Sequence, residues 1–414
     1  MQMIVTAGDF RNVRINLPAS KSISNRALVI NALAGGEMQI ENLSVCDDTY
    51  VMERALREHP YTIDIMAAGT AMRFLTAYCA VTSGERVITG TERMRHRPIG
   101  VLVDGLRALG ATIDYVGEEE FPPLRIVGGK LRGGALALPG HVSSQYISAL
   151  LMIGPMMEGG LALDLQGDIV SRPYIDMTLK LMTDFGAEAG WVGERRIEVQ
   201  SGGYHPIPYY IESDWSAASY WYEMLALSRR TDVEILLPGL SADSSQGDSA
   251  VARLFAPLGV VTEFRKEGVR EMVCLRNTGS VTGRMDCDLV NQPDLAQTLV
   301  VTCAMLGIPF RFTGLHSLKI KETDRMTALI NELHKLGCRL EEKDDSVLSW
   351  DGERHAVESE AVIDTYEDHR MAMAFAPCAL VLPQIRINNP QVVSKSYPGY
   401  WDDLRQAGFE LITR

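Results

Sequence analysis

The chain has 414 residues and is acidic, with 40 Lys and Arg against 53 Asp and Glu, for a formal net charge of -13. Its composition, 46% hydrophobic and 22% charged, is that of a globular protein, which excludes disorder and predicts two or three domains. Because phosphate backbones demand a basic surface, nucleic acid is excluded as a partner, and any anionic ligand needs a local basic pocket.

The sequence shows no membrane or targeting signal. Its longest apolar stretch, residues 147–157, is far shorter than the roughly 20 residues that cross a bilayer. Residues 1–10 have neither a signal-peptide nor a transit-peptide pattern. The seven cysteines have no metal-ligand spacing and are interpreted as reduced packing residues. We therefore expect a cytoplasmic protein without a membrane span.

One pattern recurs along the chain: an amphipathic helix, then Gly, then a short alternating strand. It occupies residues 102–115, 179–192, 251–264, 328–341 and 400–412. The glycine just past each helix is the expected C-terminal stop, since it accepts a left-handed backbone. A second type of helix precedes each of these, opening near residues 22, 70, 144, 214, 294 and 368. The chain therefore divides into six repeats of about 70 to 80 residues, each with two helices and several strands.

The first repeat is shorter, and strands between residues 56 and 67 are expected to be missing. Six repeats exceed one domain, so they should form two lobes of three. We expect one lobe at residues 20–212 and the other at 1–19 with 213–414, the N-terminal strand at residues 3–17 lying beside the later repeats. The fold class is α/β (α+β). Ordinary α/β alternation without a repeat is the alternative, and the shared glycine spacing argues against it.

Most of the unusual polar residues lie where these helices begin. A helix N-terminus offers free N–H groups and about half a positive charge, which favours an anion. Simple capping is the alternative, and for Thr70, Ser144 or Asp214 taken alone it is the better explanation.

Capping does not explain the basic residues near the helix starts, because a cation there opposes the helix dipole unless an anion compensates it. These residues are Lys21, Arg26, Arg73, Arg97, Lys321, Arg325, Arg370 and Lys395. A solvated surface charge is the alternative for any one of them. Eight cations together outweigh Asp294 and Glu322, the two acidic residues placed among them. The set therefore predicts a concentrated positive pocket in an acidic protein.

These residues lie in ordered motifs that cover nearly the whole chain: SKSISNR at 20–26, AGTAMR at 68–73, RMRHRPIG at 93–100, SSQ at 143–145, GDIVSRPY at 167–174, PD at 293–294, KETDR at 321–325 and DHRMAM at 368–373, followed by Lys395. The set resembles the enolpyruvyl transferase family, in its 5-enolpyruvylshikimate-3-phosphate synthase branch. SKS with NR, KETDR and DHRMAM are highly specific together, whereas AGT or SSQ alone would be weak.

The resemblance implies a two-lobed inside-out α/β barrel with six βαβαββ repeats, three per lobe, the first truncated here, and helix N-termini facing the interlobe cleft. It implies transfer of the enolpyruvyl group of phosphoenolpyruvate to the 5-hydroxyl of shikimate 3-phosphate, with release of phosphate. It further implies two small-molecule substrates and neither a metal nor an organic cofactor. We expect a monomer.

Carried over by position, the expected contacts of shikimate 3-phosphate are Lys21, Ser22, Arg26, Ser143, Ser144, Gln145, Ser171, Tyr174, Asp294 and Lys321. Those of phosphoenolpyruvate are Lys21, Gly69, Arg97, Gln145, Arg325, Arg370 and Lys395, with Thr70, Arg73 and His369 in support. Arginine forks suit carboxylate and phosphate oxygens, whereas lysine acts as a point charge.

Asp294 resembles the base that takes the hydroxyl proton, and Glu322 the acid that protonates phosphoenolpyruvate, with Lys21 assisting. Without the resemblance, a helix cap for Asp294 and an ion pair for Glu322 explain these residues equally well. His369 is not expected to bind a metal, because no second ligand stands at metal spacing.

Two departures from the family pattern leave other functions open. Ala67 and Ser317 stand where the family usually has Asn. The absence of these two Asn side chains, together with the short first repeat, leaves open a weakly active or silent paralogue that binds anions. Transfer to another acceptor, such as a nucleotide sugar, is a further alternative, although residues 94–128 contain no Cys that could serve as the acid typical of that branch.

Overall fold

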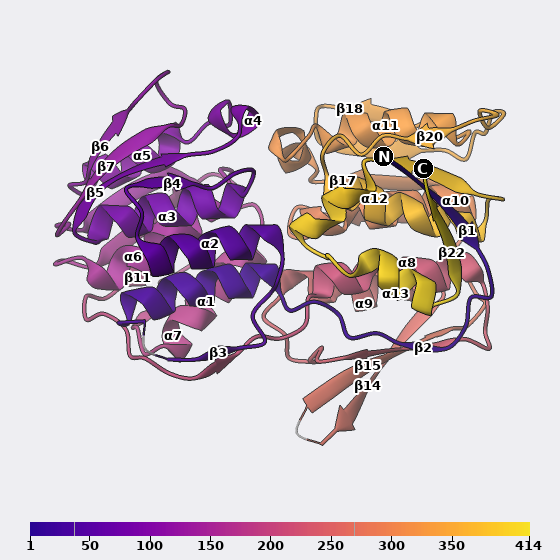
Figure 1. The fold of residues 1–414 in the computed structure, drawn as a ribbon, viewed down its shortest axis with the longest axis horizontal. Helices are drawn as coiled ribbons and strands as arrows, with labels where there is room; N and C mark the ends of the chain where they lie inside the picture. The colour runs from indigo at the N-terminus through magenta and orange to yellow at the C-terminus, as the bar shows by residue number, and fades with distance from the viewer. Residues whose placement is uncertain (37, 269) are drawn as a thin grey trace. The chain divides into compact units, whose positions relative to one another are not determined.

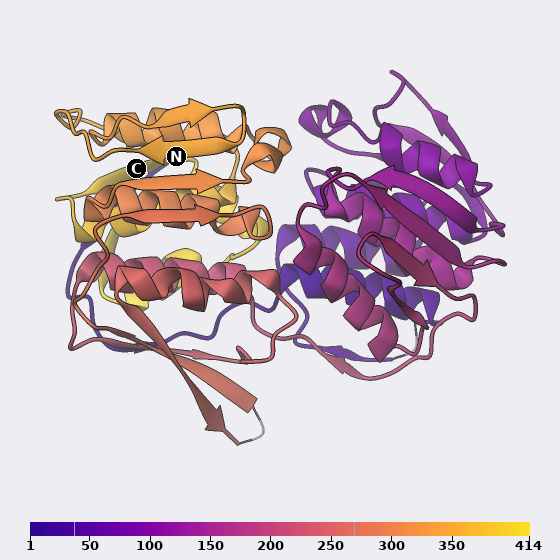
Figure 2. The same cartoon turned by 180° about the vertical axis from the view of Figure 1, so that it is seen from behind.

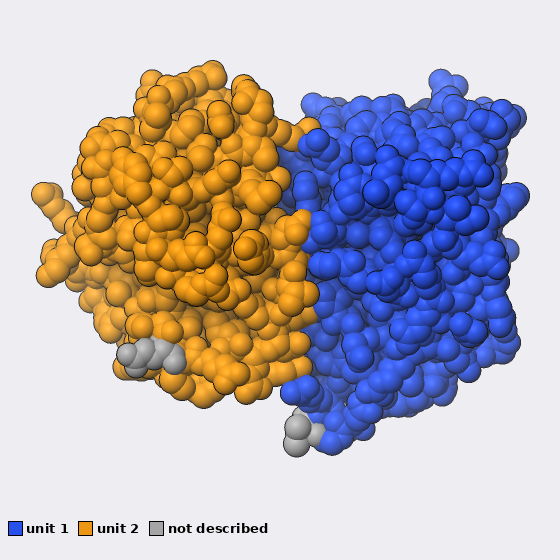
Figure 3. All heavy atoms as spheres, viewed as in Figure 1, with its two compact units in different colours: residues 1–18, 212–414 blue, residues 19–211 orange. Residues whose placement is uncertain are grey.

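The computed structural model describes residues 1–36, 38–268 and 270–414. It divides into two compact units, unit 1 with Met1–Pro18 and Glu212–Arg414, and unit 2 with Ala19–Ile211 (Figure 3). Each unit has a hydrophobic core of its own. No helix in the described ranges is long and apolar enough to cross a membrane.

Unit 2 holds seven α-helices within its described residues: α1 Lys21–Leu33, α2 Asp47–Glu58, α3 Gly69–Val81, α4 Glu92–Arg95, α5 Gly100–Ala108, α6 Ser144–Ile153 and α7 Arg172–Asp184, with the 3-10 turn η1 Gly154–Met156. Its strands are β3 Ile40–Glu41, β4 Thr62–Asp64, β5 Gly84–Thr89, β6 Thr112–Tyr115, β7 Leu124–Gly128, β8 Gly134–Pro139, β9 Leu161–Gln166, β10 Ala189–Trp191, β11 Arg196–Val199 and β12 Tyr209–Tyr210.

In unit 1 the helices are α8 Trp215–Ser228, α9 Val251–Phe255, α10 Ala296–Leu306, α11 Arg325–Lys335, α12 His369–Phe375 and α13 Tyr400–Gln406. The 3-10 turns are η2 Gly247–Ala250, η3 Ala256–Leu258, η4 Pro293–Leu295, η5 His316–Ile320, η6 Ala376–Leu380 and η7 Pro390–Lys395. The strands are β1 Gln2–Ala7, β2 Val13–Arg14, β13 Glu234–Pro238, β14 Val260–Glu267, β15 Arg270–Asn277, β16 Met285–Asp288, β17 Phe310–Thr313, β18 Glu341–Lys343, β19 Val347–Trp350, β20 Val362–Ile363, β21 Ile385–Asn388 and β22 Phe409–Thr413.

Within the described residues the strands form six sheets, three in each unit. Unit 2 has the orders β4-β5-β7-β6, β10-β11-β9-β8 and β12-β3, and unit 1 has β14-β15-β13-β2, β16-β17-β19-β18 and β20-β21-β1-β22. Among the sheets of the described residues, only β12-β3, which pairs β3 of the first repeat with β12 from the end of unit 2, has two strands instead of four. The predicted set of six repeats with a shortened first one is therefore confirmed.

The helices that open each repeat fill the interior of their unit, and the sheets lie outside them. Every residue of α10 is buried, and in α3 only Thr70 and Val81 are not fully buried. Within unit 1, α8, α10 and α12 pack against one another, as Figures 1 and 2 show. Helices inside and strands outside are what an inside-out α/β barrel requires, and the predicted fold class is confirmed.

The recurring glycines end helices as expected. Gly110, Gly186, Gly259, Gly337 and Gly408 all have positive φ angles, between 84° and 105°. The N-terminal segment differs in one respect from the single strand expected at residues 3–17. It forms two strands in different sheets, because β1 pairs with β21 and β22 whereas β2 pairs with β13.

Candidate active site

The first two turns of four helices lie together in unit 2. Arg26 in α1 donates from Nε to the hydroxyl of Thr178 in α7 at 2.7 Å, and from Nη2 to that of Ser148 in α6 at 3.1 Å. Gln145 in α6 donates to the hydroxyl of Thr70 in α3 at 3.2 Å. Each of these residues lies in the first two turns of its helix. The four N-termini therefore share one end of unit 2, where their N–H groups favour an anion.

Several residues expected to contact shikimate 3-phosphate lie at this end. Ser143 caps α6, its hydroxyl accepting from the Gln145 amide at 3.3 Å. Ser171 precedes α7 in a left-handed conformation, with φ of 54°. The carbonyl groups of Ser22 and Tyr174 accept from the Arg26 guanidinium at 2.9 and 3.5 Å. The structure thus brings together residues from motifs far apart in the sequence, and Ser144 begins α6 beside them.

Two of the predicted cations turn inward. Arg26 is 2% exposed, and burial lowers the pKa of its guanidinium to about 10. Arg73 is 4% exposed and donates to the carbonyl groups of Gly69 and Pro98, both at 3.2 Å. Arg73 therefore braces the start of α3 and the Pro98 loop, which suits the supporting role expected of it.

Arg97 lies directly against Gly69. A Cβ atom added to Gly69 would stand 2.7 Å from Nη1 of Arg97 and 3.3 Å from its Cζ. Only glycine lets the guanidinium come this close to the backbone at the start of α3. The two residues expected to hold phosphoenolpyruvate are therefore neighbours.

One partner of this set was missed by the sequence reasoning. Lys21 Nζ lies 3.1 Å from Oδ2 of Asp48 in the first turn of α2, and both side chains are mostly buried. An acid in the first turn of a helix is so common that it carries no signal. Asp48 therefore holds the Lys21 ammonium group in place.

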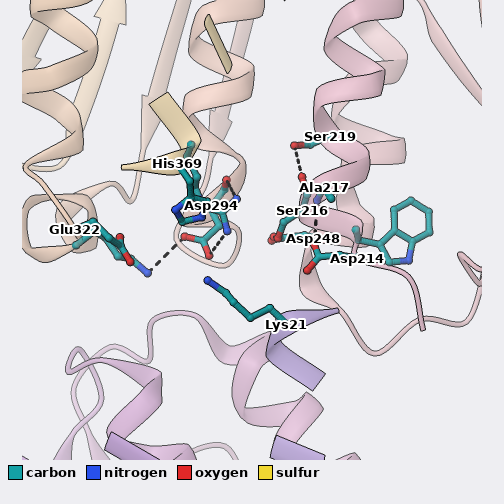
Figure 4. Close-up of polar contacts among 12 residues, drawn as sticks. Lys21, Asp214, Ser216, Ala217, Ser219, Asp248, Asp294, Glu322 and His369 are labelled. Carbon is teal, nitrogen blue, oxygen red and sulfur yellow. Dashed lines mark hydrogen bonds and ion pairs between the residues drawn. The ribbon is translucent and has the colours of Figure 1, made fainter. Parts of the chain in front are cut away.

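In unit 1, Asp294 is the centre of an ion-pair cluster (Figure 4). It lies in η4, just before α10. Its Oδ1 is 3.0 Å from Nη1 of Arg325 and 3.5 Å from Nζ of Lys321. Its Oδ2 is 2.9 Å from Nη2 of Arg370. Three predicted cations therefore converge on the predicted base.

Arg325 joins the predicted base to the predicted acid. Its Nη2 is 2.8 Å from Glu322, its Nη1 holds Asp294, and its Nε is 2.7 Å from Asp368, the N-cap of α12. Burial opposes the charge of this guanidinium, but the three carboxylates outweigh burial and raise the pKa of Arg325. Asp368 was recognised in its motif but not as a member of the site.

The two remaining predicted residues of unit 1 lie at or beside the start of α12. Lys395, the last residue of η7, donates from Nζ to the carbonyl oxygen of Glu367 at 2.8 Å. His369 opens α12 and is 2% exposed. Among the described residues, no group of three or more His, Cys, Asp or Glu could hold a metal ion.

Asp248 is a further buried carboxyl group beside the cluster, and no motif in the sequence points to it. It is 3% exposed in η2 and accepts a hydrogen bond from the hydroxyl of Ser216, in the first turn of α8. Burial, reinforced by the negative charge of Asp294, raises the pKa of Asp248 to about 7. With Asp48 in unit 2 and Asp368 in unit 1 also present, each group of cations has a smaller positive surplus than the sequence suggested.

Comparisons with known proteins identify the family of the chain. The chain matches the sequence profile of the family described as EPSP synthase (3-phosphoshikimate 1-carboxyvinyltransferase) over residues 7–61 and 57–404. It is 60% identical over 411 residues to the 3-phosphoshikimate 1-carboxyvinyltransferase of Bacteroides fragilis, with 99% of each chain covered. It is 36% identical to that of Yersinia pseudotuberculosis, covering 94% of this chain and 95% of the relative.

A solved structure shares the fold. The EPSP synthase from Acinetobacter baumannii superposes with a TM-score of 0.79 over all of both chains, at 21% sequence identity. The likeness extends through both units, so the fold described above is that of the solved protein.

Proposed function

The chain belongs to the EPSP synthase family, and we propose that the polar groups described in its two units bind and convert the substrates of that family. The protein transfers the enolpyruvyl group of phosphoenolpyruvate to the 5-hydroxyl of shikimate 3-phosphate and releases phosphate. This reaction is a step of the shikimate pathway to aromatic amino acids. The observation that carries this assignment is the similarity, over nearly the full chain, to relatives named 3-phosphoshikimate 1-carboxyvinyltransferase.

We assign shikimate 3-phosphate chiefly to the shared helix end of unit 2. Its phosphate would take the N–H groups and hydroxyls around Ser143, Ser144 and Ser22, and Tyr174 and Ser171 would position the ring. Support comes from the hydrogen bonds by which Arg26 joins the first two turns of α1, α6 and α7. Lys321 and Asp294 would add contacts from unit 1.

Phosphoenolpyruvate would be held by cations from both units. Arg97 beside Gly69 and Arg370 offer guanidinium forks, which match carboxylate and phosphate oxygens, whereas Lys21 and Lys395 act as point charges. In the structure Arg325 already meets three carboxylates. Arg325 would therefore position the acid and the base as well as contact phosphoenolpyruvate.

The chemistry would proceed by addition and elimination. Glu322 donates a proton to the methylene carbon of phosphoenolpyruvate, the 5-hydroxyl oxygen bonds to the neighbouring carbon, and Asp294 accepts the hydroxyl proton. In the tetrahedral adduct the former double bond is single. Phosphate then leaves with the electrons of its carbon–oxygen bond while the methyl group returns a proton to Glu322. Lys21 would neutralise charge on the phosphate.

The geometry of Arg325 supports this division of labour. One guanidinium holds the acid from Nη2 and the base from Nη1, so the two carboxylates keep a fixed spacing. Each carboxylate has different further neighbours, Lys321 and Arg370 around Asp294 among them. Different neighbours allow one group to act as acid and the other as base.

The test is phosphate release from the purified protein mixed with both substrates. We expect release that requires shikimate 3-phosphate as well as phosphoenolpyruvate. The departures at Ala67 and Ser317 make binding without turnover the second candidate. Calorimetric binding of shikimate 3-phosphate with no phosphate release would establish that candidate and refute the transferase activity.

We place the reaction in the cytoplasm and propose that the chain acts as a monomer. All seven cysteines are free thiols and six are buried, which suits a reducing compartment. Each unit also encloses its own core. Light scattering during gel filtration tests the second point, since a mass near twice 45.7 kDa would refute it.

Changing Gly69 to Ala should weaken phosphoenolpyruvate binding. The new Cβ would stand 2.7 Å from Arg97 Nη1, so the guanidinium must move. We expect the KM for phosphoenolpyruvate to rise about tenfold, the size expected from losing one charged hydrogen bond. The KM for shikimate 3-phosphate should change little. Gly190→Ala is the matched control, because no atom lies within 4 Å of its added Cβ.

A further inference from the structure

A left-handed turn precedes the cap of α12 in unit 1. Tyr366 and Glu367 have φ angles of 53° and 57°, although neither is glycine or asparagine. Consecutive left-handed residues with long side chains are unfavourable and persist only where surrounding contacts hold them. The turn therefore needs an anchor.

Two hydrogen-bond acceptors at this turn explain why its conformation matters. The carbonyl oxygen of Glu367 accepts from Lys395 Nζ at 2.8 Å. The next residue, Asp368, accepts from Arg325 Nε at 2.7 Å and caps α12 through the Arg370 amide at 2.9 Å. If the turn relaxed to the right-handed region, both acceptors would change direction. Three cations of the proposed site depend on it.

The anchor is a buried glutamate near the end of α11. The hydroxyl of Tyr366 donates to Oε1 of Glu332 at 2.6 Å, and the Asp364 amide donates to Oε2 at 3.0 Å. Glu332 is 0% exposed, and its charge is met by Lys335 Nζ at 2.7 Å, which also contacts Asp364 at 3.1 Å. A phenol bound to a buried carboxylate is among the stronger hydrogen bonds.

Helix α11 therefore holds the segment 364–368 at two points. Its first residue, Arg325, binds Asp368, and Glu332 in its later turns binds Tyr366 and the Asp364 amide. We propose that Tyr366 and Glu332 are positioning residues that lock the left-handed turn and so orient Arg325, Arg370 and Lys395 toward phosphoenolpyruvate. The inference rests on the proposed function, because that function assigns these cations to the substrate.

Tyr366→Phe removes only the hydroxyl and tests the lock. We expect the KM for phosphoenolpyruvate to rise about tenfold, with the KM for shikimate 3-phosphate nearly unchanged. Tyr61→Phe is the matched control, since it deletes a similar bond from a tyrosine hydroxyl to a glutamate, Glu85 at 3.1 Å in unit 2. It should leave both KM values unchanged.

A second substitution separates the lock from general loosening of unit 1. Glycine adopts the left-handed conformation without penalty and keeps the carbonyl that Lys395 binds. In a Glu367→Gly background, the loss caused by Tyr366→Phe should shrink from about tenfold to about twofold. Such non-additivity would not follow from a merely structural role of the phenol.

The outcomes are distinct. An unchanged KM for phosphoenolpyruvate in Tyr366→Phe, or an equal loss with and without Glu367→Gly, would overturn the lock. Parallel losses in both KM values would do the same. If the unaltered protein released no phosphate, the proposed function would fail instead, because the lock is measured only against an active enzyme.

Discussion

Asp294→Asn should lower kcat for phosphate release by about a thousandfold, within the range expected for loss of a general base. Asparagine keeps the shape of the side chain but cannot accept the hydroxyl proton. It also leaves Arg325, Arg370 and Lys321, the three cations around Asp294, with less negative charge to meet. The KM for phosphoenolpyruvate should therefore stay the same or fall, even though turnover is nearly lost.

This pairing of a large fall in kcat with no rise in KM is the diagnostic result. It would be measured by steady-state phosphate release with each substrate varied in turn. Asp286→Asn is the matched control, because Asp286 is also paired with an arginine, Arg284 at 3.0 Å, but is exposed on β16. Activity of Asp294→Asn within about tenfold of the unaltered protein would rule out Asp294 as the base.

The fold was predictable because its signals are local. A glycine past an amphipathic helix needs a left-handed backbone wherever it occurs, and Gly186 and Gly337 both have φ of 84°. Their recurrence marked the repeats, and the missing segment after residue 56 pointed to the two-stranded sheet β12-β3. By contrast, the split of the N-terminal segment between β21 and β13 depends on pairing with strands more than 200 residues away.

The candidate site divides in the same way. Its motif residues were visible because they stand at helix starts, where a cation is unexpected. Their partners were not, since Asp48, Asp248 and Glu332 are ordinary acids whose importance comes from burial and distant contacts. The direction of a side chain was equally hidden, as Arg73 turns to carbonyl groups of its own unit. Tertiary packing supplies this information, and the chemical pattern of one segment does not contain it.

Glu223→Gln should change how the stability of unit 1 depends on pH. Glu223 is 0% exposed in α8, and burial raises the pKa of its carboxyl group well above the usual range, with the Thr302 hydroxyl opposing this only in part. At pH values above the usual pKa of a glutamate and below this raised pKa, the native carboxyl is therefore protonated, whereas the unfolded one is ionised. Unfolding releases a proton, so rising pH favours the unfolded state. Each pH unit should cost the unaltered protein about 1.4 kcal/mol relative to the glutamine variant.

Urea unfolding of both proteins across that pH range measures the difference. Trp215, Trp221 and Trp350 are buried in unit 1, so tryptophan fluorescence mainly follows this unit. Glu267→Gln is the control of opposite sign, because Arg14 lowers the pKa of Glu267 in the same unit and its effect on stability appears only at acidic pH. Its curve should run parallel to that of the unaltered protein. A Glu223→Gln curve that is also parallel would mean that Glu223 is ionised in the native state, a charge that the apolar interior around Tyr400 and Cys378 should not admit.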